Sequence, residues 1–85
     1  MRIEHRLQIK AVCPVDSLPD VYSCTVRCKR VIPVEDILAA VKKVTVDAIY
    51  QEDMTQQLHR LLAAEVETVG WHSGVMTRCV CGGDE

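Results

Sequence analysis

The sequence of 85 residues lacks several features that would assign it to a broad class at once. No apolar run approaches the roughly 18 residues that span a bilayer, so we expect no membrane partner. Ten basic and twelve acidic residues are spread along the chain without a basic block, which argues against a dedicated nucleic-acid-binding domain. The N-terminal MRIEHRLQIK has no continuous apolar segment of the signal-peptide kind. We therefore expect a cytoplasmic protein with reduced cysteines.

Metal-binding patterns are also missing, although the chain has five cysteines and three histidines. Cys24 and Cys28 share one face of a predicted strand but would lie about 13 Å apart, too far to share an ion. Cys79 and Cys81 would lie about 7 Å apart on another strand. Neither pair has the two-residue gap on a turn that is typical of zinc ligands, so we predict no metal site. These cysteines are interpreted as small buried hydrophobic residues.

Two alternating segments near the N-terminus predict a pair of β-strands. From Ile3 to Ala11, apolar residues alternate with charged or polar ones, which is the period of a strand with one solvent-exposed face. We expect this strand to reach about Val12. The same period from Tyr22 to Cys28 predicts a second strand that pairs antiparallel with the first.

Apolar residues that recur every three or four positions then predict two helices. The first is expected over residues 34–47, where an acidic first turn suits a helix start. The second begins beside residues 50–53, ends near Ala64 and has Asp53 and Gln56 as an expected capping pair.

The tail from Glu65 to Cys81 is rich in valine and threonine and is broken at Ser73-Gly74, which predicts two more strands joined by a tight turn. The order ββααββ indicates an α+β domain over residues 1–85, in which an antiparallel sheet has both helices on one face. Such a sheet leaves two edges unpaired, and a chain of this length has a thin core. We therefore expect a homo-oligomer.

The loop VCPVDSLPDVY contains the main candidates for chemistry. Cys13 is expected at a strand end before Pro14, which takes it out of a continuing ladder and leaves its thiol accessible. Asp20 follows Pro19, so each reactive group stands next to a rigid proline, an arrangement suited to holding an acid near a nucleophile. From these residues alone, a structural loop cysteine is still the simpler interpretation, because a nucleophile needs an activated thiolate.

The three histidines differ in their expected surroundings. His59 lies between the apolar positions of the second predicted helix and is expected to be solvated or at a subunit contact. His5 shares the apolar face of the first strand and is also interpreted as noncatalytic. His72 precedes the turn at Ser73-Gly74, where side chains can project into a site between subunits, and it stays a candidate site residue.

The segment Cys13-Pro-Val-Asp-Ser-Leu-Pro-Asp20 resembles the Cys-Pro-x-x-x-x-Pro-Asp loop of the 7-cyano-7-deazaguanine (preQ0) nitrile reductase family. The resemblance implies that Cys13 attacks the nitrile carbon to give a thioimide and that Asp20 is the general acid. Tyr50-Gln51-Glu52-Asp53 is similar to the family's Phe-His-Glu-Asp, which implies that Glu52 binds the purine-like base. Gln51 replaces the family's histidine; it is expected to hydrogen-bond substrate but cannot carry a proton. His72 is the candidate to replace that histidine.

The same resemblance implies the tunnelling fold (T-fold), whose ββααββ units join edge to edge into oligomeric barrels with sites at subunit interfaces. The family's Glu-Ser-Lys-type NADPH motif is not apparent in residues 29–36. The short chain resembles more the compact branch that adds ammonia to the thioimide and forms an amidine, the archaeosine-type reaction. We therefore predict an amidine-forming enzyme of 7-deazaguanine (queuosine/archaeosine-type) tRNA modification, with no certain cofactor.

Three alternatives stay open. An NADPH-dependent 7-cyano-7-deazaguanine reductase would share the thioimide and use NADPH as cofactor. A pterin-related tunnelling-fold enzyme would keep Glu52 but has little use for the spacing of Cys13 and Asp20. A noncatalytic ligand-binding or oligomeric interaction module would have a loop thiol only, since a fold does not fix a function. For the enzymes of 7-deazaguanine modification, the substrate is either a free base or a base already within a nucleic acid.

Overall fold

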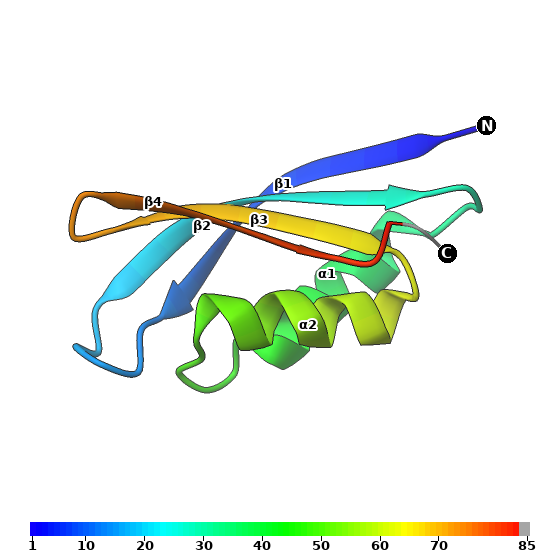
Figure 1. The fold of residues 1–85 in the computed structure, drawn as a ribbon. Helices are drawn as coiled ribbons and strands as arrows, with labels where there is room; N and C mark the ends of the chain where they lie inside the picture. Colours follow the sequence, from blue (N-terminus) through cyan, green and yellow to red (C-terminus); the bar gives the residue numbers. More distant parts are fainter. Residues whose placement is uncertain (84–85) are drawn as a thin grey trace.

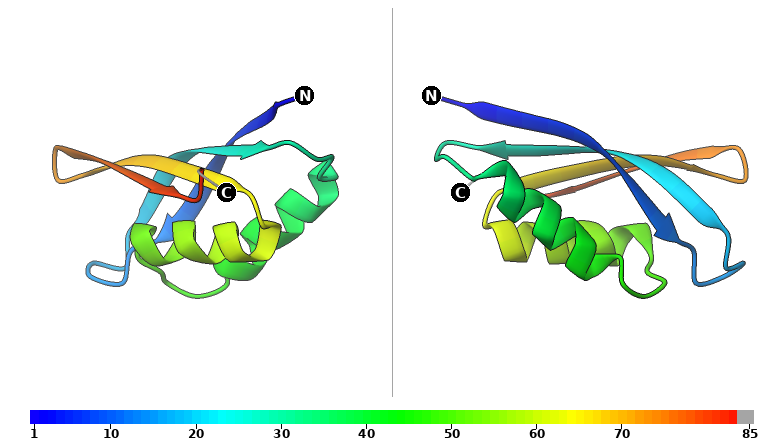
Figure 2. Two further views of the ribbon diagram at one scale, coloured as in Figure 1. Left: turned by 45° about the vertical axis from the view of Figure 1, so that its right-hand side comes forward. Right: turned by 180° about the vertical axis from the view of Figure 1, so that it is seen from behind.

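A four-stranded antiparallel sheet with both helices on one face forms the fold, as the computed structural model shows for residues 1–83 (Figure 1). The two further views in Figure 2 agree on this layering. The strands follow one another across the sheet in chain order, so β1 and β4 are its edges. The predicted α+β class and the ββααββ order are confirmed. The elements are β1 (Ile3–Val12), β2 (Pro19–Cys28), α1 (Val34–Val44), α2 (Gln51–Leu62), β3 (Glu65–His72) and β4 (Val75–Cys81).

The first hairpin follows the predicted alternation but is longer than predicted. Ile9 and Ala11 are buried on the helix-covered face of β1, while their neighbours in the strand are exposed. Strand β2 begins at Pro19 and not at Tyr22, since a proline is tolerated as the first residue of a strand. The predicted position of Asp20 in the loop is therefore wrong, because Asp20 pairs with Ala11 inside the sheet. The connecting loop is reduced to residues 13–18.

Helix α1 ends at Val44, so the predicted end at Asp47 is wrong. The Thr45 backbone N–H and its Oγ1 both donate to the Val41 carbonyl, at 3.1 and 2.8 Å. Side-chain bonds of this kind compete with the helical pattern, and the β-branched residues 44–46 have low helix propensity. The helix therefore stops before Thr45, which directs both its backbone and its side-chain donor to the Val41 carbonyl.

Helix α2 begins at Gln51, with Tyr50 in an extended conformation as its N-cap and no side-chain cap bond. The predicted capping pair of Asp53 and Gln56 is therefore wrong, because Asp53 already lies within the first turn. There its negative charge interacts favourably with the positive end of the helix dipole, but its side chain caps no backbone N–H. The helix ends at Leu62, and Ala63 adopts a left-handed conformation with φ of 49°.

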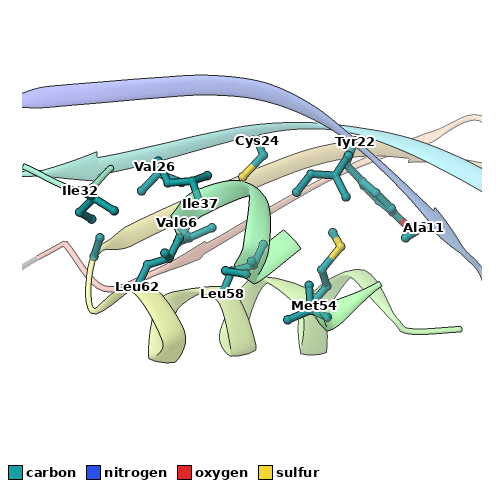
Figure 3. Close-up of a cluster of buried hydrophobic side chains, with 14 residues drawn as sticks. Ala11, Tyr22, Cys24, Val26, Ile32, Ile37, Met54, Leu58, Leu62 and Val66 are labelled. Carbon is teal, nitrogen blue, oxygen red and sulfur yellow. The ribbon is translucent and has the colours of Figure 1, made fainter. Parts of the chain in front are cut away.

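The core lies between the helix-covered face of the sheet and the two helices (Figure 3). Cys24 belongs to it, and burial raises the pKa of its thiol to about 11, so it stays neutral. The interpretation of Cys24 as a small hydrophobic residue is confirmed, whereas Cys28, Cys79 and Cys81 are only half-buried. The labelled side chains in Figure 3 are Ala11, Tyr22, Cys24, Val26, Ile32, Ile37, Met54, Leu58, Leu62 and Val66.

Two histidines lie away from the loop of residues 13–18. His59 is not simply solvated, as its Nδ1 donates to the Ala64 carbonyl at 2.7 Å, just beyond the end of α2. His5 lies on the helix-covered side of β1 as predicted, and its buried Nε2 has no hydrogen-bond partner within residues 1–83. Neither helix in this part of the chain is long and apolar enough to cross a membrane.

The predicted turn between the last two strands is confirmed at Ser73-Gly74. Both residues have positive φ, 50° and 82°, which is the conformation of a type I′ turn in a two-residue hairpin. The pairs from Val66 with Cys81 to His72 with Val75 run through the whole hairpin without a bulge. His72 is therefore held at the end of β3, directly before the turn.

Gly70 allows the Tyr22 ring to lie against the backbone of β3. A Cβ atom at position 70 would lie 2.4 Å from Tyr22 Cδ1 and 2.6 Å from Cε1, closer than van der Waals contact permits. We expect Gly70→Ala to lower the free energy of unfolding by about 1–3 kcal/mol, the usual cost of overpacking. Urea denaturation measures this change. Gly74→Asn is the control, since nothing lies within 4 Å there and asparagine tolerates positive φ.

Candidate functional site

A cavity of about 320 Å³ lies where the loop of residues 13–18, the start of α2 and the β3–β4 turn meet. All five predicted site residues line it, although they come from three separate parts of the chain. Larger cavities lie elsewhere on the surface but contain neither the loop thiol nor a histidine. The five residues brought together are Cys13, Asp20, Gln51, Glu52 and His72.

Cys13 sits on a loop that is closed by its own backbone. The Cys13 N–H donates to the Leu18 carbonyl at 3.0 Å, and the Ser17 N–H donates to the Cys13 carbonyl at 2.9 Å. Asp16 accepts a bond from the Leu18 N–H at 3.0 Å, and Ser17 takes a left-handed conformation with φ of 60°. The half-buried thiol is thus held at a fixed position on the cavity wall.

Asp20 faces the cavity from β2, and His72 faces it from the end of β3. The Asp20 Oδ2 lies 3.7 Å from His72 Nδ1, and both side chains are about one-quarter to one-third exposed. Placement on paired strands gives these two groups less freedom than a loop would give them. An acidic and a basic group thus meet beside the loop thiol.

Gln51 holds His72 from the opposite side. Its Nε2 donates to the Thr77 carbonyl at 3.0 Å and to the Thr68 carbonyl at 3.2 Å, with Thr68 Oγ1 at 3.1 Å. Carbonyl oxygens only accept, so these contacts fix which end of the amide is nitrogen. The Gln51 Oε1 then faces His72 Nε2 at 2.9 Å. Since the amide is buried and all its hydrogen-bonding groups have protein partners, its position is set by the fold.

Two buried threonines complete the support of Gln51. Thr55 Oγ1 donates to the Gln51 carbonyl at 2.7 Å and lies 2.6 Å from Thr68 Oγ1. Because the Thr55 proton is already used, the Thr68 hydroxyl donates to Thr55 and is left to accept from the Gln51 amide. Each member of this buried network therefore has a consistent role, which makes the network rigid.

Comparison with known proteins identifies the fold. The structure of archaeosine synthase QueF-Like in the apo form matches with a TM-score of 0.80, covering 94% of this chain and 90% of that one at 17% identity. The chain has the tunnelling fold. The tunnelling fold predicted for the single chain is thus confirmed. No protein-family model and no curated protein sequence matches the chain.

Tyr22 also lines the cavity, although the sequence pattern predicted it only as a strand residue. It is buried, and its ring lies 5.7 Å from the His72 ring at an angle of 46°. Burial raises the pKa of the Tyr22 phenol to about 12, and the nearby Asp20 and Cys13 add to the effect. The phenol therefore stays neutral at any physiological pH. Asp20 and Tyr22 are two residues apart, so a strand beginning at Pro19 would have placed both on one face.

Glu52 occupies the first turn of α2 at the exposed rim of the tunnelling-fold cavity. This position is at the N-terminal end of the helix, where the helix dipole is positive. Among residues 1–83, no group of three or more His, Cys, Asp or Glu side chains is arranged to hold a metal ion. The site therefore combines a thiol, an acid paired with an imidazole, and a separate carboxylate at the rim.

Proposed function

We propose that this protein binds preQ0 and attacks its nitrile through Cys13 to form a covalent thioimide in 7-deazaguanine modification. The observation that carries the proposal is the meeting of Cys13, Asp20 and Glu52 around one cavity. Cys13 and Asp20 lie on either side of one short loop, whereas Glu52 comes from the start of α2. All three match the positions implied by the resemblance to the nitrile reductase family. A structural loop cysteine would not require an acid and a base-binding carboxylate beside it.

The proposed chemistry suits a nitrile, which is a weak electrophile. As the sulfur–carbon bond forms, one π pair of the nitrile moves to nitrogen, which needs a proton at the same time. Asp20 is proposed as the donor of that proton, since an acid held in reach lowers the barrier to attack. The loop bonds at Cys13 and the strand position of Asp20 hold these two groups, both of which line the cavity.

Glu52 is proposed to bind the base, because a carboxylate accepts the paired N–H donors of an aminopyrimidinone edge. We expect Glu52→Gln to weaken preQ0 binding by roughly 10- to 100-fold, the effect of losing about 1.5–3 kcal/mol from a charge-assisted hydrogen bond. Isothermal titration calorimetry on a Cys13→Ala background measures binding without covalent capture. Asp53→Asn is the matched control, since this neighbouring carboxylate does not line the cavity. Unchanged affinity in the Glu52 variant would remove Glu52 from this role.

For the second half-reaction, we favour addition of ammonia and release of an amidine over reduction by NADPH. The support is the segment 29–36, which offers no Glu-Ser-Lys-type motif. The substrate is then a 7-deazaguanine nitrile, either free or within a nucleic acid. We also propose a homo-oligomer with sites at subunit interfaces, because the edge strands β1 and β4 each pair on one side within residues 1–83.

The test is intact-mass measurement after incubation of the purified protein with preQ0. Thioimide formation adds the full mass of the nitrile, since addition expels no atom. If the protein keeps its unmodified mass at saturating preQ0, the proposal is wrong. If the adduct forms, ammonium and NADPH are added separately and the released base is identified, which distinguishes the amidine from the amine.

A further inference from the structure

We propose that His72 is a positioning residue that keeps one proton on the pair it forms with Asp20, ready for the substrate nitrogen. The inference rests on the proposed function and deepens it. An acid that works near neutral pH must hold a proton there, whereas a carboxyl group alone in water is ionised at pH 7. The site therefore needs a feature that retains a proton beside Asp20, and His72 is placed to provide it.

The tautomer of His72 follows from its neighbours. The Gln51 amide nitrogen faces the carbonyls of Thr68 and Thr77, so its oxygen must point at His72 Nε2, 2.9 Å away. An amide oxygen only accepts hydrogen bonds, so Nε2 carries a proton in both charge states of the ring. The other nitrogen, Nδ1, is therefore the one that gains and loses a proton.

Nδ1 is also the nitrogen that faces Asp20, at 3.7 Å from Oδ2. Without a proton between them, a lone pair and a carboxylate oxygen would face one another, which is repulsive. One proton on either atom turns the contact into an attraction. The separation is longer than a hydrogen bond, as is common for catalytic contacts in the absence of substrate.

Five further titratable groups line the cavity around the pair. They come from the loop, from β2 and from the start of α2, and the Tyr22 ring lies 5.7 Å from the His72 ring. The five groups are Cys13, Asp16, Tyr22, Tyr50 and Glu52. The neutral Tyr22 phenol interacts with Asp20 as a hydrogen-bond donor, which favours the carboxylate and so places the proton of the pair on His72. The formal negative charges of Asp16 and Glu52 favour a proton on the pair. Among the described residues, no lysine or arginine lines this cavity.

The proton balance closes within the site. The sulfur–carbon bond forms as one nitrile π pair moves to nitrogen, and that nitrogen takes the proton of the pair. The proton lost by the Cys13 thiol then takes its place on the pair, so the pair ends with the one proton it began with. Gln51 cannot exchange a proton itself and acts only by holding the imidazole.

The first test reads the proton pair directly and needs no substrate. Long-range ¹H–¹⁵N correlation on ¹⁵N-labelled protein reports each ring nitrogen, with His72 assigned through His72→Gln. We expect Nε2 of His72 to be protonated at pH 7, and Asp20→Asn to reduce the protonated fraction of Nδ1 at that pH. His59 should not respond. An unprotonated Nε2, or a His72 spectrum that Asp20→Asn leaves unchanged, would overturn the inference.

The second test is the pH profile of adduct formation with preQ0. The ratio of the wild-type rate to the His72→Gln rate should grow by roughly tenfold per unit from pH 5 to 7, because an unassisted carboxyl loses its proton in that proportion. A purely structural role would lower the rate by one factor at every pH and would overturn the inference. His59→Gln is the matched control. If the wild type forms no adduct, the proposed function fails, while the spectra still decide the proton pair.

Discussion

Replacing Cys13 with alanine is expected to abolish covalent capture of preQ0, so that the protein keeps its unmodified mass at any concentration of the nitrile. The thiol is the only nucleophile that the proposed step uses, and alanine leaves no atom to form the bond. The loop should persist in the variant, because the bonds that close it involve the backbone of Cys13 and not its sulfur. Intact-mass spectrometry against a time course of the unmodified protein measures the effect.

The matched control is Cys81→Ala, which removes a half-buried thiol from β4 outside the cavity. This variant should gain the same mass as the unmodified protein. A mass increase in the Cys13 variant would show that another cysteine reacts, and the assignment of the nucleophile would then be withdrawn. Loss of the adduct in both variants would point to a general structural effect.

Replacing Asp20 with asparagine is expected to slow adduct formation by about 10²- to 10⁴-fold, the range in which a positioned general acid contributes. Asparagine has nearly the same size and keeps the strand pairing with Ala11, so base binding at Glu52 should change little. Quenched mass measurements give the rate, and calorimetry on a Cys13→Ala background gives the affinity.

Asp16→Asn is the control for Asp20, since Asp16 is the other aspartate that lines the cavity. Its side chain accepts a bond from the Leu18 N–H, and asparagine makes the same local turn. A large loss of rate at position 16, or no loss at position 20, would contradict the assignment of the acid.

The strands were the most predictable part of this fold. A residue in a half-buried strand leaves a two-residue pattern whatever its partners are, and Ile9 and Ala11 are buried as that pattern predicts. The turn at Ser73-Gly74 was also predictable, because few residue pairs suit a tight hairpin turn. The ends of elements were less predictable: Thr45 ends α1 through a side-chain bond, and Tyr50 caps α2 without one.

The site was only partly predictable, because the contacts that organise it cross between elements. Cys13, Asp20 and Glu52 were found through local segments that resemble those of a known family. The hydrogen bond between Gln51 and His72 joins a helix to a strand end, and no local sequence pattern predicts a contact of this kind. Tyr22 was hidden because the predicted strand began at it, so its shared face with Asp20 was not visible.

The Thr77 carbonyl that accepts from Gln51 belongs to β4, an edge strand paired on one side only within residues 1–83. Edge strands fray with a lower opening free energy than central ones. Each local opening of β4 would break the hydrogen bond from Gln51 to the Thr77 carbonyl. The Gln51 amide would then hold the His72 ring less firmly. Amide exchange along β4 should therefore report how long the site stays intact, and any chain that pairs with the free edge would protect the site from a distance.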